Sequence, residues 1–252
     1  DTVEVKIDPK TGTLIRDGVP SIINHDDKTG IEAALRIKEQ LGGTVTVVSM
    51  GPPQADVALR EALAMGCDEA YLVSAREFGG SDTYATSGII AAALKKIGYD
   101  LIITGRQAID GDTAQVGPQI AEKLHLPQVS YVEEVVEAAA DHVVVKRQFE
   151  DGYHIIKIKT PCLLTAIAEL ATPRYMSVRG IVEAYEKEIK VLGFEDLKDG
   201  LELDMIGLKG SPTNVYQSFT KEVKGAGTIL EGLSADEAVK AIMDKLEAKF
   251  II

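Results

Sequence analysis

Apolar residues in the first half of the chain alternate between short β-branched runs and stretches with helical spacing. Ile31, Leu35 and Leu41 fall on one face of a helix that ends at Gly42, and residues 24–27 supply polar side chains suited to capping its start. The pattern predicts, in order, a helix at 31–41, a strand at 44–50, a helix at 59–66, a strand at 69–73, a helix at 82–97 and a strand at 100–104. Such alternation is typical of a doubly wound α/β fold, whose mostly parallel sheet has helices on both faces and ligands at the carboxyl ends of its strands.

Outside this region the pattern changes twice. Residues 3–15 alternate apolar and polar positions around a Pro-Lys-Thr-Gly turn, which predicts a β-hairpin. After Pro127 the helical spacing is lost, and the chain reads as consecutive strands at 132–136, 142–147, 154–158 and 162–166. We interpret these four strands as an antiparallel section of the same domain.

The last quarter of the chain predicts a second, smaller region. From residue 191 to about 233 periodic apolar residues are scarce and glycines are frequent, and an amphipathic helix then runs from 235 to 250. We therefore divide the chain into an α/β domain at 1–190 and an extended arm with a terminal helix at 191–252. Such a helix either folds back on its own core or docks on another subunit, and the arm favours docking on a partner subunit.

Composition narrows the class of protein. The chain has 45% hydrophobic and 26% charged residues, and 27 basic against 39 acidic side chains give a net charge of −12. No basic block suits a nucleic acid partner, and the apolar stretches are too short for membrane insertion. Cys67 and Cys162 lie 95 positions apart without neighbouring ligand residues, so we expect two reduced, buried thiols and a cytoplasmic protein without a metal site.

Residues 100–116 are the strongest candidate for a ligand-binding segment. An apolar strand leads into Gly105, a polar loop follows, and a helix is predicted to begin with the turn Thr113-Ala114-Gln115-Val116. Gly105 and Gly111 permit close backbone approach, Asp112 or Thr113 can cap the helix, and the free N–H groups of its first turn suit a phosphate. Arg106 could face a phosphate or a flavin ring. Plain helix capping after a tight turn explains the same residues, and neither a Walker loop nor a Gly-x-Gly-x-x-Gly motif is present.

Several motifs, in order, resemble one family over nearly the whole chain. The run Ile-Thr-Gly-Arg-Gln-Ala-Ile-Asp-Gly-Asp-Thr-Ala-Gln-Val-Gly-Pro at 103–118 is similar to the nucleotide loop of the β subunit of electron transfer flavoproteins. Further matching motifs occur at 16–24, 50–53, 62–70, 146–152, 160–165 and 173–180. The resemblance implies an adenine-nucleotide α-hydrolase-like fold that pairs with a flavin-carrying α subunit.

The resemblance also implies which cofactor the chain binds. Ordinary members hold AMP as a structural piece, whereas electron-bifurcating members hold a second FAD that accepts hydride from NADH. The Asp-Gly-Asp-Thr-Ala-Gln-Val-Gly-Pro version resembles the bifurcating kind, and small residues at Gly111 and Ala114 leave room for a pyrophosphate. We therefore expect FAD, with AMP as the alternative. Electrons would pass to ferredoxin or flavodoxin and, through the α-subunit FAD, to an acyl-CoA dehydrogenase.

Site residues follow from the matching motifs. The implied nucleotide contacts lie at a helix start, a strand end and the loop, and they are Asn24, His25, Asp26, Asp27, Met50, Gly105, Arg106, Gln107, Ala108, Ile109, Asp110, Gly111, Asp112, Thr113, Ala114, Gln115 and Val116. The segment 173–178 resembles the loop by which the family docks on acyl-CoA dehydrogenases, with Arg174 and Tyr175 as contacts and Val178 as the apolar anchor. An incidental exposed loop is the alternative, because interface anchors are usually large or aromatic.

Two features depart from the family pattern. Members begin with a β-strand, ahead of the position of Asp1, that forms the first, central strand of the sheet, and that strand is not among the 252 residues. His25 stands where proline is common, which affects the local loop shape. Two other functions remain open: a non-bifurcating carrier subunit that binds AMP, and a stand-alone adenine-nucleotide sensor or hydrolase on a similar sheet.

Overall fold

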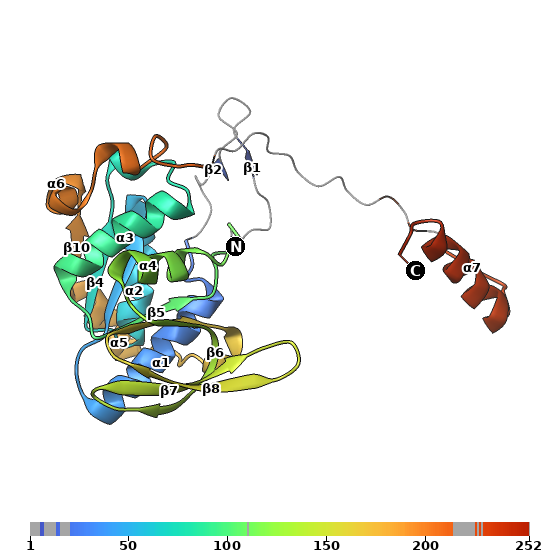
Figure 1. The fold of residues 1–252 in the computed structure, drawn as a ribbon, viewed down its shortest axis with the longest axis horizontal. Helices are drawn as coiled ribbons and strands as arrows, with labels where there is room; N and C mark the ends of the chain where they lie inside the picture. Colours follow the sequence, from blue (N-terminus) through green and yellow to red (C-terminus); the bar gives the residue numbers. More distant parts are fainter. Residues whose placement is uncertain are drawn as a thin grey trace. The chain divides into compact units, whose positions relative to one another are not determined.

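The computed structural model describes residues 6–7, 14–15, 21–109, 111–213, 225, 227 and 229–251. These residues form two units (Figure 1). The larger unit contains 21–109 and 111–213, and the second contains the two short strands near the amino terminus together with the described residues from 225 onward. The predicted nucleotide loop and docking loop both lie in the larger unit.

The strands of the larger unit form two sheets. The first sheet is all parallel, in the order β10 (Ile189–Leu192), β4 (Glu69–Val73), β3 (Thr46–Met50). The second has the order β5 (Leu101–Gly105), β9 (Cys162–Ala166), β6 (Gln128–Ala138), β7 (His142–Gln148), β8 (Tyr153–Lys159). In this sheet β5, β9 and β6 run parallel to one another. The next strand, β7, is antiparallel to both of its neighbours, β6 and β8. The predicted α/β class, with a mostly parallel sheet and an antiparallel section, is confirmed.

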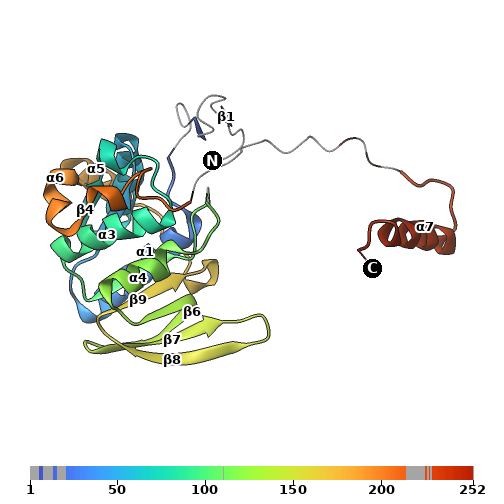
Figure 2. The same ribbon diagram turned by 45° about the horizontal axis from the view of Figure 1, so that its top comes forward.

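Helices cover both faces of these sheets. They are α1 (His25–Leu41), α2 (Asp56–Met65), α3 (Thr83–Ile97), α4 (Val116–Leu124), α5 (Val178–Glu186) and the one-turn α6 (Phe194–Leu197). Ala33 of α1 packs with Leu164 of β9, whereas the neighbouring Leu163 packs with Ile120 of α4. Because successive residues of a strand point to opposite faces, α1 and α4 lie on opposite sides of the sheet. Figure 2 shows α3 and α4 side by side.

The strand β9 corrects one prediction. We expected it to continue the antiparallel section, but it lies between β5 and β6 and runs parallel to both. All five of its residues are buried. A strand covered on both faces reads as an unbroken apolar run, which is typical of the centre of a parallel sheet. Its sequence, Cys-Leu-Leu-Thr-Ala, has that form.

Residues 191–206, which the sequence analysis assigned to the arm, pack within the larger unit. Val191 and Leu192 extend β10 and pair with Leu72 and Val73 of β4. Further along, Leu197 and Ile206 are buried in a cluster with Phe78. The sequence does not reveal this packing because α6 is a single turn that buries only Leu197, which is too short to show a helical period. Short 3₁₀ turns occur along the whole larger unit, at Pro53–Ala55, Arg76–Phe78, Ala168–Leu170, Lys198–Gly200 and Leu203–Met205.

The second unit contains the predicted hairpin strands and the predicted terminal helix. Its strands β1 (Lys6–Ile7) and β2 (Leu14–Ile15) pair antiparallel. The helix α7 (Ala235–Glu247) begins with a capping box between Ser234 and Glu237. None of its residues is buried. In the described part of the chain, no helix has the length and hydropathy needed to cross a membrane.

Candidate functional site

Gly105 joins the end of β5 to the start of α1. Its backbone N–H donates a hydrogen bond of 2.6 Å to Oδ1 of Asp27. A Cβ atom at this position would lie 2.8 Å from the backbone nitrogen of Asp27 and 2.9 Å from its Cγ. Real Cβ atoms do not approach other atoms so closely, and the backbone nitrogen of Asp27 cannot yield without moving the helix. The close approach of strand end and helix start therefore requires glycine.

Asn24 connects the same helix start to the loop after β5. It occupies the N-cap position of α1, but its side chain makes no capping hydrogen bond. Instead its Nδ2 donates to Oδ2 of Asp27, at 2.9 Å, and to the backbone oxygen of Gln107, at 2.8 Å. The prediction that these side chains cap α1 is thus wrong for Asn24. The polar groups at 24–27 hold the loop to the helix.

The charges at this junction are close together. Burial raises the pKa of Asp27, although the hydrogen bonds from Asn24 and Gly105 act in the opposite direction, and the neighbouring carboxylate of Asp26 adds to the rise. The Nε atom of Arg106 lies 3.5 Å from Oδ2 of Asp26. Arg106 therefore brings a guanidinium charge to the point where β5 ends and α1 begins.

The helix after the loop begins later than predicted. The structure starts α4 at Val116, with Gln115 at the N-cap position, so Thr113 and Ala114 belong to the loop. The backbone of Asp112 and Ala114 is in the left-handed region, with φ of 50° and 53°. A helix beginning at Thr113 would place Pro118 in its interior, where the proline ring clashes with the carbonyl four residues earlier. Neither Asp112 nor Thr113 caps α4.

The first turn of α4 packs tightly against the end of β5. A Cβ on Gly117 would lie 2.7 Å from Oγ1 of Thr104 and 2.9 Å from Cγ2 of Thr165. Oγ1 of Thr104 and Nε of Arg106 are both buried and without a hydrogen-bond partner. Sequence reasoning missed Thr104 because it reads as part of an apolar strand. It missed Gly117 because the contacts of Gly117 are with side chains of β5 and β9, which a local pattern does not report.

These features fit the phosphates of an adenine nucleotide. The first turns of α1 and α4 each present backbone N–H groups without an intrahelical acceptor, and such groups bind anions. Two glycines let the backbone of one element approach another, and Arg106 adds a positive charge. The buried hydroxyl of Thr104, which has no hydrogen-bond partner, is the kind of group that a ligand satisfies, whereas Nε of Arg106 already faces the carboxylate of Asp26.

The remaining predicted nucleotide residues lie away from the junction of β5 and α1, or are exposed along the loop. His25 is exposed on the first turn of α1, and Ala108, Ile109, Gly111, Asp112 and Thr113 are exposed along the loop. Gln115 accepts a hydrogen bond of 2.9 Å from Thr83 of α3. Met50 packs in the cluster around Ile89, and the described contacts do not join it to the loop. Asp110 lies outside the described residues.

The predicted docking loop presents two of its three residues to solvent. Tyr175 is 100% exposed and Val178, the first residue of α5, is 82% exposed. Arg174 is different, because its guanidinium bonds to Glu32 at 2.7 Å and to Glu39 at 2.6 Å, both on α1. These hydrogen bonds raise the pKa of Arg174. The charge of Arg174 is therefore used within the chain.

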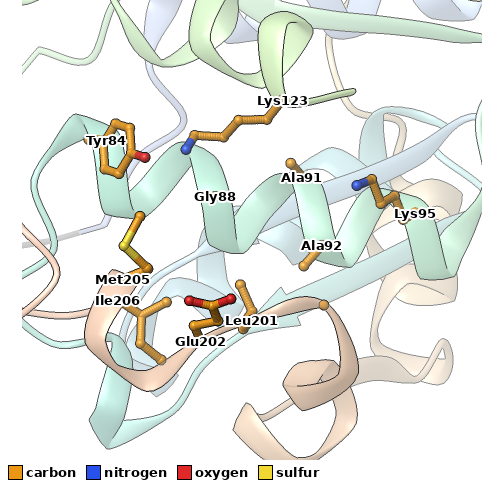
Figure 3. A pocket seen from close by; sticks show the side chains of 11 residues that line it. Tyr84, Gly88, Ala91, Ala92, Lys95, Lys123, Leu201, Glu202, Met205 and Ile206 are labelled. Atoms are coloured by element: carbon orange, nitrogen blue, oxygen red, sulfur yellow. The ribbon is translucent and has the colours of Figure 1, made fainter. Parts of the chain in front are cut away.

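A separate pocket of about 290 Å³ lies between α3, α4 and residues 200–206 (Figure 3). The Nζ atom of Lys123 lies 3.7 Å from the centre of the Tyr84 ring there, and Lys95 and Glu202 also line it. None of the predicted nucleotide residues lines this pocket. The pocket is therefore not the candidate nucleotide site.

The described residues offer little support for a metal site or a reactive cysteine. They contain no group of three or more His, Cys, Asp or Glu side chains placed to hold a metal ion. Both cysteines are buried and unpaired, and burial raises the pKa of Cys67 to about 12 and that of Cys162 to about 11. Such thiols are protonated at neutral pH and are poor nucleophiles.

Comparisons with known proteins agree with this assignment of the fold. Residues 11–197 match the electron transfer flavoprotein domain. The electron transfer flavoprotein subunit beta of Thermoanaerobacterium thermosaccharolyticum is 56% identical over 253 residues, which cover 100% of this chain and 96% of that protein. Subunit CarD of the caffeyl-CoA reductase-Etf complex of Acetobacterium woodii is 54% identical, with the same coverage. The acryloyl-CoA reductase electron transfer subunit gamma of Anaerotignum propionicum is 53% identical over 255 residues, which cover 99% of this chain and 94% of that protein.

Proposed function

Since this chain belongs to the electron transfer flavoprotein family, we propose that it is the β subunit of an electron-bifurcating complex and binds FAD. A role in electron transfer follows from family membership. The finer proposal is supported by the names of two relatives, which belong to complexes of a caffeyl-CoA reductase and an acryloyl-CoA reductase. The geometry at Gly105, where a strand end, a helix start and a guanidinium meet, supports the coarser part of the proposal, that the chain binds an adenine nucleotide.

In this proposal the nucleotide lies across the first turns of α1 and α4. A bound FAD would supply hydride acceptance from NADH and one-electron transfer, to ferredoxin or flavodoxin on one path and through the α-subunit FAD to an acyl-CoA dehydrogenase on the other. The N–H groups of Val116 and Gly117 would bind phosphate oxygens. Arg106 would balance their charge while Asp26 fixes its direction. Gln107, held by Asn24, would keep the loop in place.

The number of flavins in the assembled complex tests this proposal. We expect the purified heterodimer with its α subunit to release two FAD molecules and no AMP on denaturation, measured by absorbance and by chromatography of the extract. Arg106→Met should reduce the FAD content of the β site, because one phosphate charge loses its partner. Arg76→Met, at an exposed arginine of a separate turn, should leave the content unchanged.

The alternative is a non-bifurcating carrier that holds AMP in the same place. A heterodimer that releases one FAD and one AMP would establish the alternative and end the proposal of a second flavin. The nucleotide geometry alone fits either ligand, because both present a phosphate to the two helix starts.

The second part of the proposal concerns docking on an acyl-CoA dehydrogenase. Four exposed apolar side chains, Tyr175, Val178, Val182 and Tyr185, form what we name the docking face. The last three recur at helical spacing along α5. Exposed apolar side chains that recur on one side of a helix are typical of a protein interface.

The third part concerns α7, which we propose docks on the α subunit. Val239, Ile242 and Met243 are exposed and share one face of the helix. We expect truncation before Ser234 to abolish co-purification with a tagged α subunit, because this apolar face loses its partner. The melting temperature of the larger unit should stay the same. A truncated chain that still co-purifies at the wild-type ratio would contradict this role.

A further inference from the structure

A buried carboxylate on α1 binds the start of the docking loop. Glu32 is 3% exposed. Its Oε2 accepts hydrogen bonds from Nε of Arg174, at 2.7 Å, and from the backbone N–H of Arg174, at 3.2 Å. Its Oε1 accepts from Nε of Arg36, at 2.8 Å, and from Nη2 of Arg174, at 3.2 Å. One buried charge is thus bound by two guanidinium groups and a backbone amide.

Two further contacts join the same helix to the segment that precedes the docking face. The hydroxyl of Thr29 donates to the backbone oxygen of Ile167 at 3.0 Å, and Nη2 of Arg36 donates to the backbone oxygen of Thr172 at 3.4 Å. Thr29 is fully buried. With Glu32, these residues hold the segment at three points between 167 and 174.

The ionisation of Glu32 suits this role. Burial would raise its pKa, but the hydrogen bonds from Arg174 and Arg36 hold the pKa of Glu32 below its ordinary value. The carboxylate is therefore charged at neutral pH. Removing one partner of a buried ion pair leaves the other charge uncompensated, so each partner depends on the other for its position.

We propose that Glu32 is the positioning residue of the docking face, because it binds Arg174 and so fixes the backbone that presents Tyr175 and Val178. This inference rests on the docking role proposed above for that face. It also changes the role of Arg174, which the sequence suggested as a direct contact with the partner. In the structure Arg174 acts through the chain, and the exposed apolar side chains next to it make the contact.

Helix α1 then serves two sites. Its first turn carries Asp26 and Asp27, which bind the loop at 105–107, and its next turns carry Thr29, Glu32 and Arg36. The nucleotide loop and the backbone that carries the docking face are therefore both held by α1.

Glu32→Gln tests the inference in the assembled complex, because it keeps the shape of the side chain and removes its charge. We expect hydrogen exchange of the Arg174 amide to become about tenfold faster. The KM for an acyl-CoA dehydrogenase that the wild-type complex reduces should rise about tenfold, with kcat and nucleotide content unchanged. Arg174→Lys, which keeps the charge but cannot bind both Glu32 and Glu39 as a fork, should give a smaller rise in KM.

Glu39→Gln is the matched control, because Glu39 binds Arg174 through an exposed carboxylate. It should change KM and Arg174 exchange less than twofold. Val178→Asp separates the two proposals. If Val178→Asp impairs docking while Glu32→Gln keeps wild-type exchange and KM, the positioning role of Glu32 is overturned and the docking face stands. If Val178→Asp leaves KM unchanged, the docking face itself fails, and the positioning role fails with it.

Discussion

Replacing Gly105 with alanine is expected to lower the free energy of unfolding by about 2–6 kcal/mol and to empty the nucleotide site. The added Cβ would lie 2.8 Å from the backbone nitrogen of Asp27, so β5 and α1 must separate. Overpacking of this kind costs about 1–3 kcal/mol, and losing the hydrogen bond to a buried carboxylate adds about 1–3 kcal/mol. The measurements are urea unfolding followed by circular dichroism, and nucleotide extraction from the complex.

Gly152→Ala is the control for Gly105→Ala. Gly152 lies in the turn between β7 and β8, and a Cβ there meets nothing within 4 Å. We expect its unfolding midpoint and nucleotide content to match those of the wild type. A Gly105→Ala protein with full nucleotide content and unchanged stability would show that the close approach of α1 to β5 is not needed for the site.

Replacing Val178 with aspartate is expected to raise the KM for the acyl-CoA dehydrogenase about thirtyfold or more without destabilising the chain. Loss of a hot-spot residue at the centre of an interface costs about 2 kcal/mol or more of binding free energy, which corresponds to about thirtyfold. Val178 is 82% exposed and is the first residue of α5, where an acidic side chain favours the helix. Steady-state kinetics and thermal unfolding of the same preparation separate docking from folding.

Val57→Asp makes the same chemical change at a matched position. Val57 is 62% exposed and lies in the first turn of α2, outside the docking face. Its KM should equal that of the wild type. If both variants raised KM to the same degree, added negative charge rather than the loss of an apolar anchor would explain the effect of Val178→Asp.

Much of the fold follows from local pattern, because helix caps and β-branched runs specify elements independently of their neighbours. The end of α1 at Gly42 and the strand at Glu69–Val73 are of this kind. The direction of β9 is not, since a buried apolar strand fits either orientation until its neighbours are known. The packing of residues 191–206 is hidden for a related reason, because the single turn of α6 buries only Leu197 and shows no helical period.

The candidate site shows the same division. The sequence indicates the glycine and the polar residues on either side of β5, and the structure brings Asn24, Asp27, Gly105 and Gln107 together. The start of α4 was predicted three residues early, because the capping residues Asp112 and Thr113 outweighed the position of Pro118. The interaction of Glu32 with Arg174 joins positions 142 apart, and no local pattern reports such a pair.

The double use of α1 restricts how its sequence can vary. Asp27 and Glu32 are five residues apart, or about 7.5 Å along the axis, and an α-helix turns about 100° for each residue. A single insertion or deletion between them would rotate Glu32 away from Arg174 while Asp27 stayed against Gly105. The number of residues between the two contact points of this helix is therefore fixed by the contacts at its two ends.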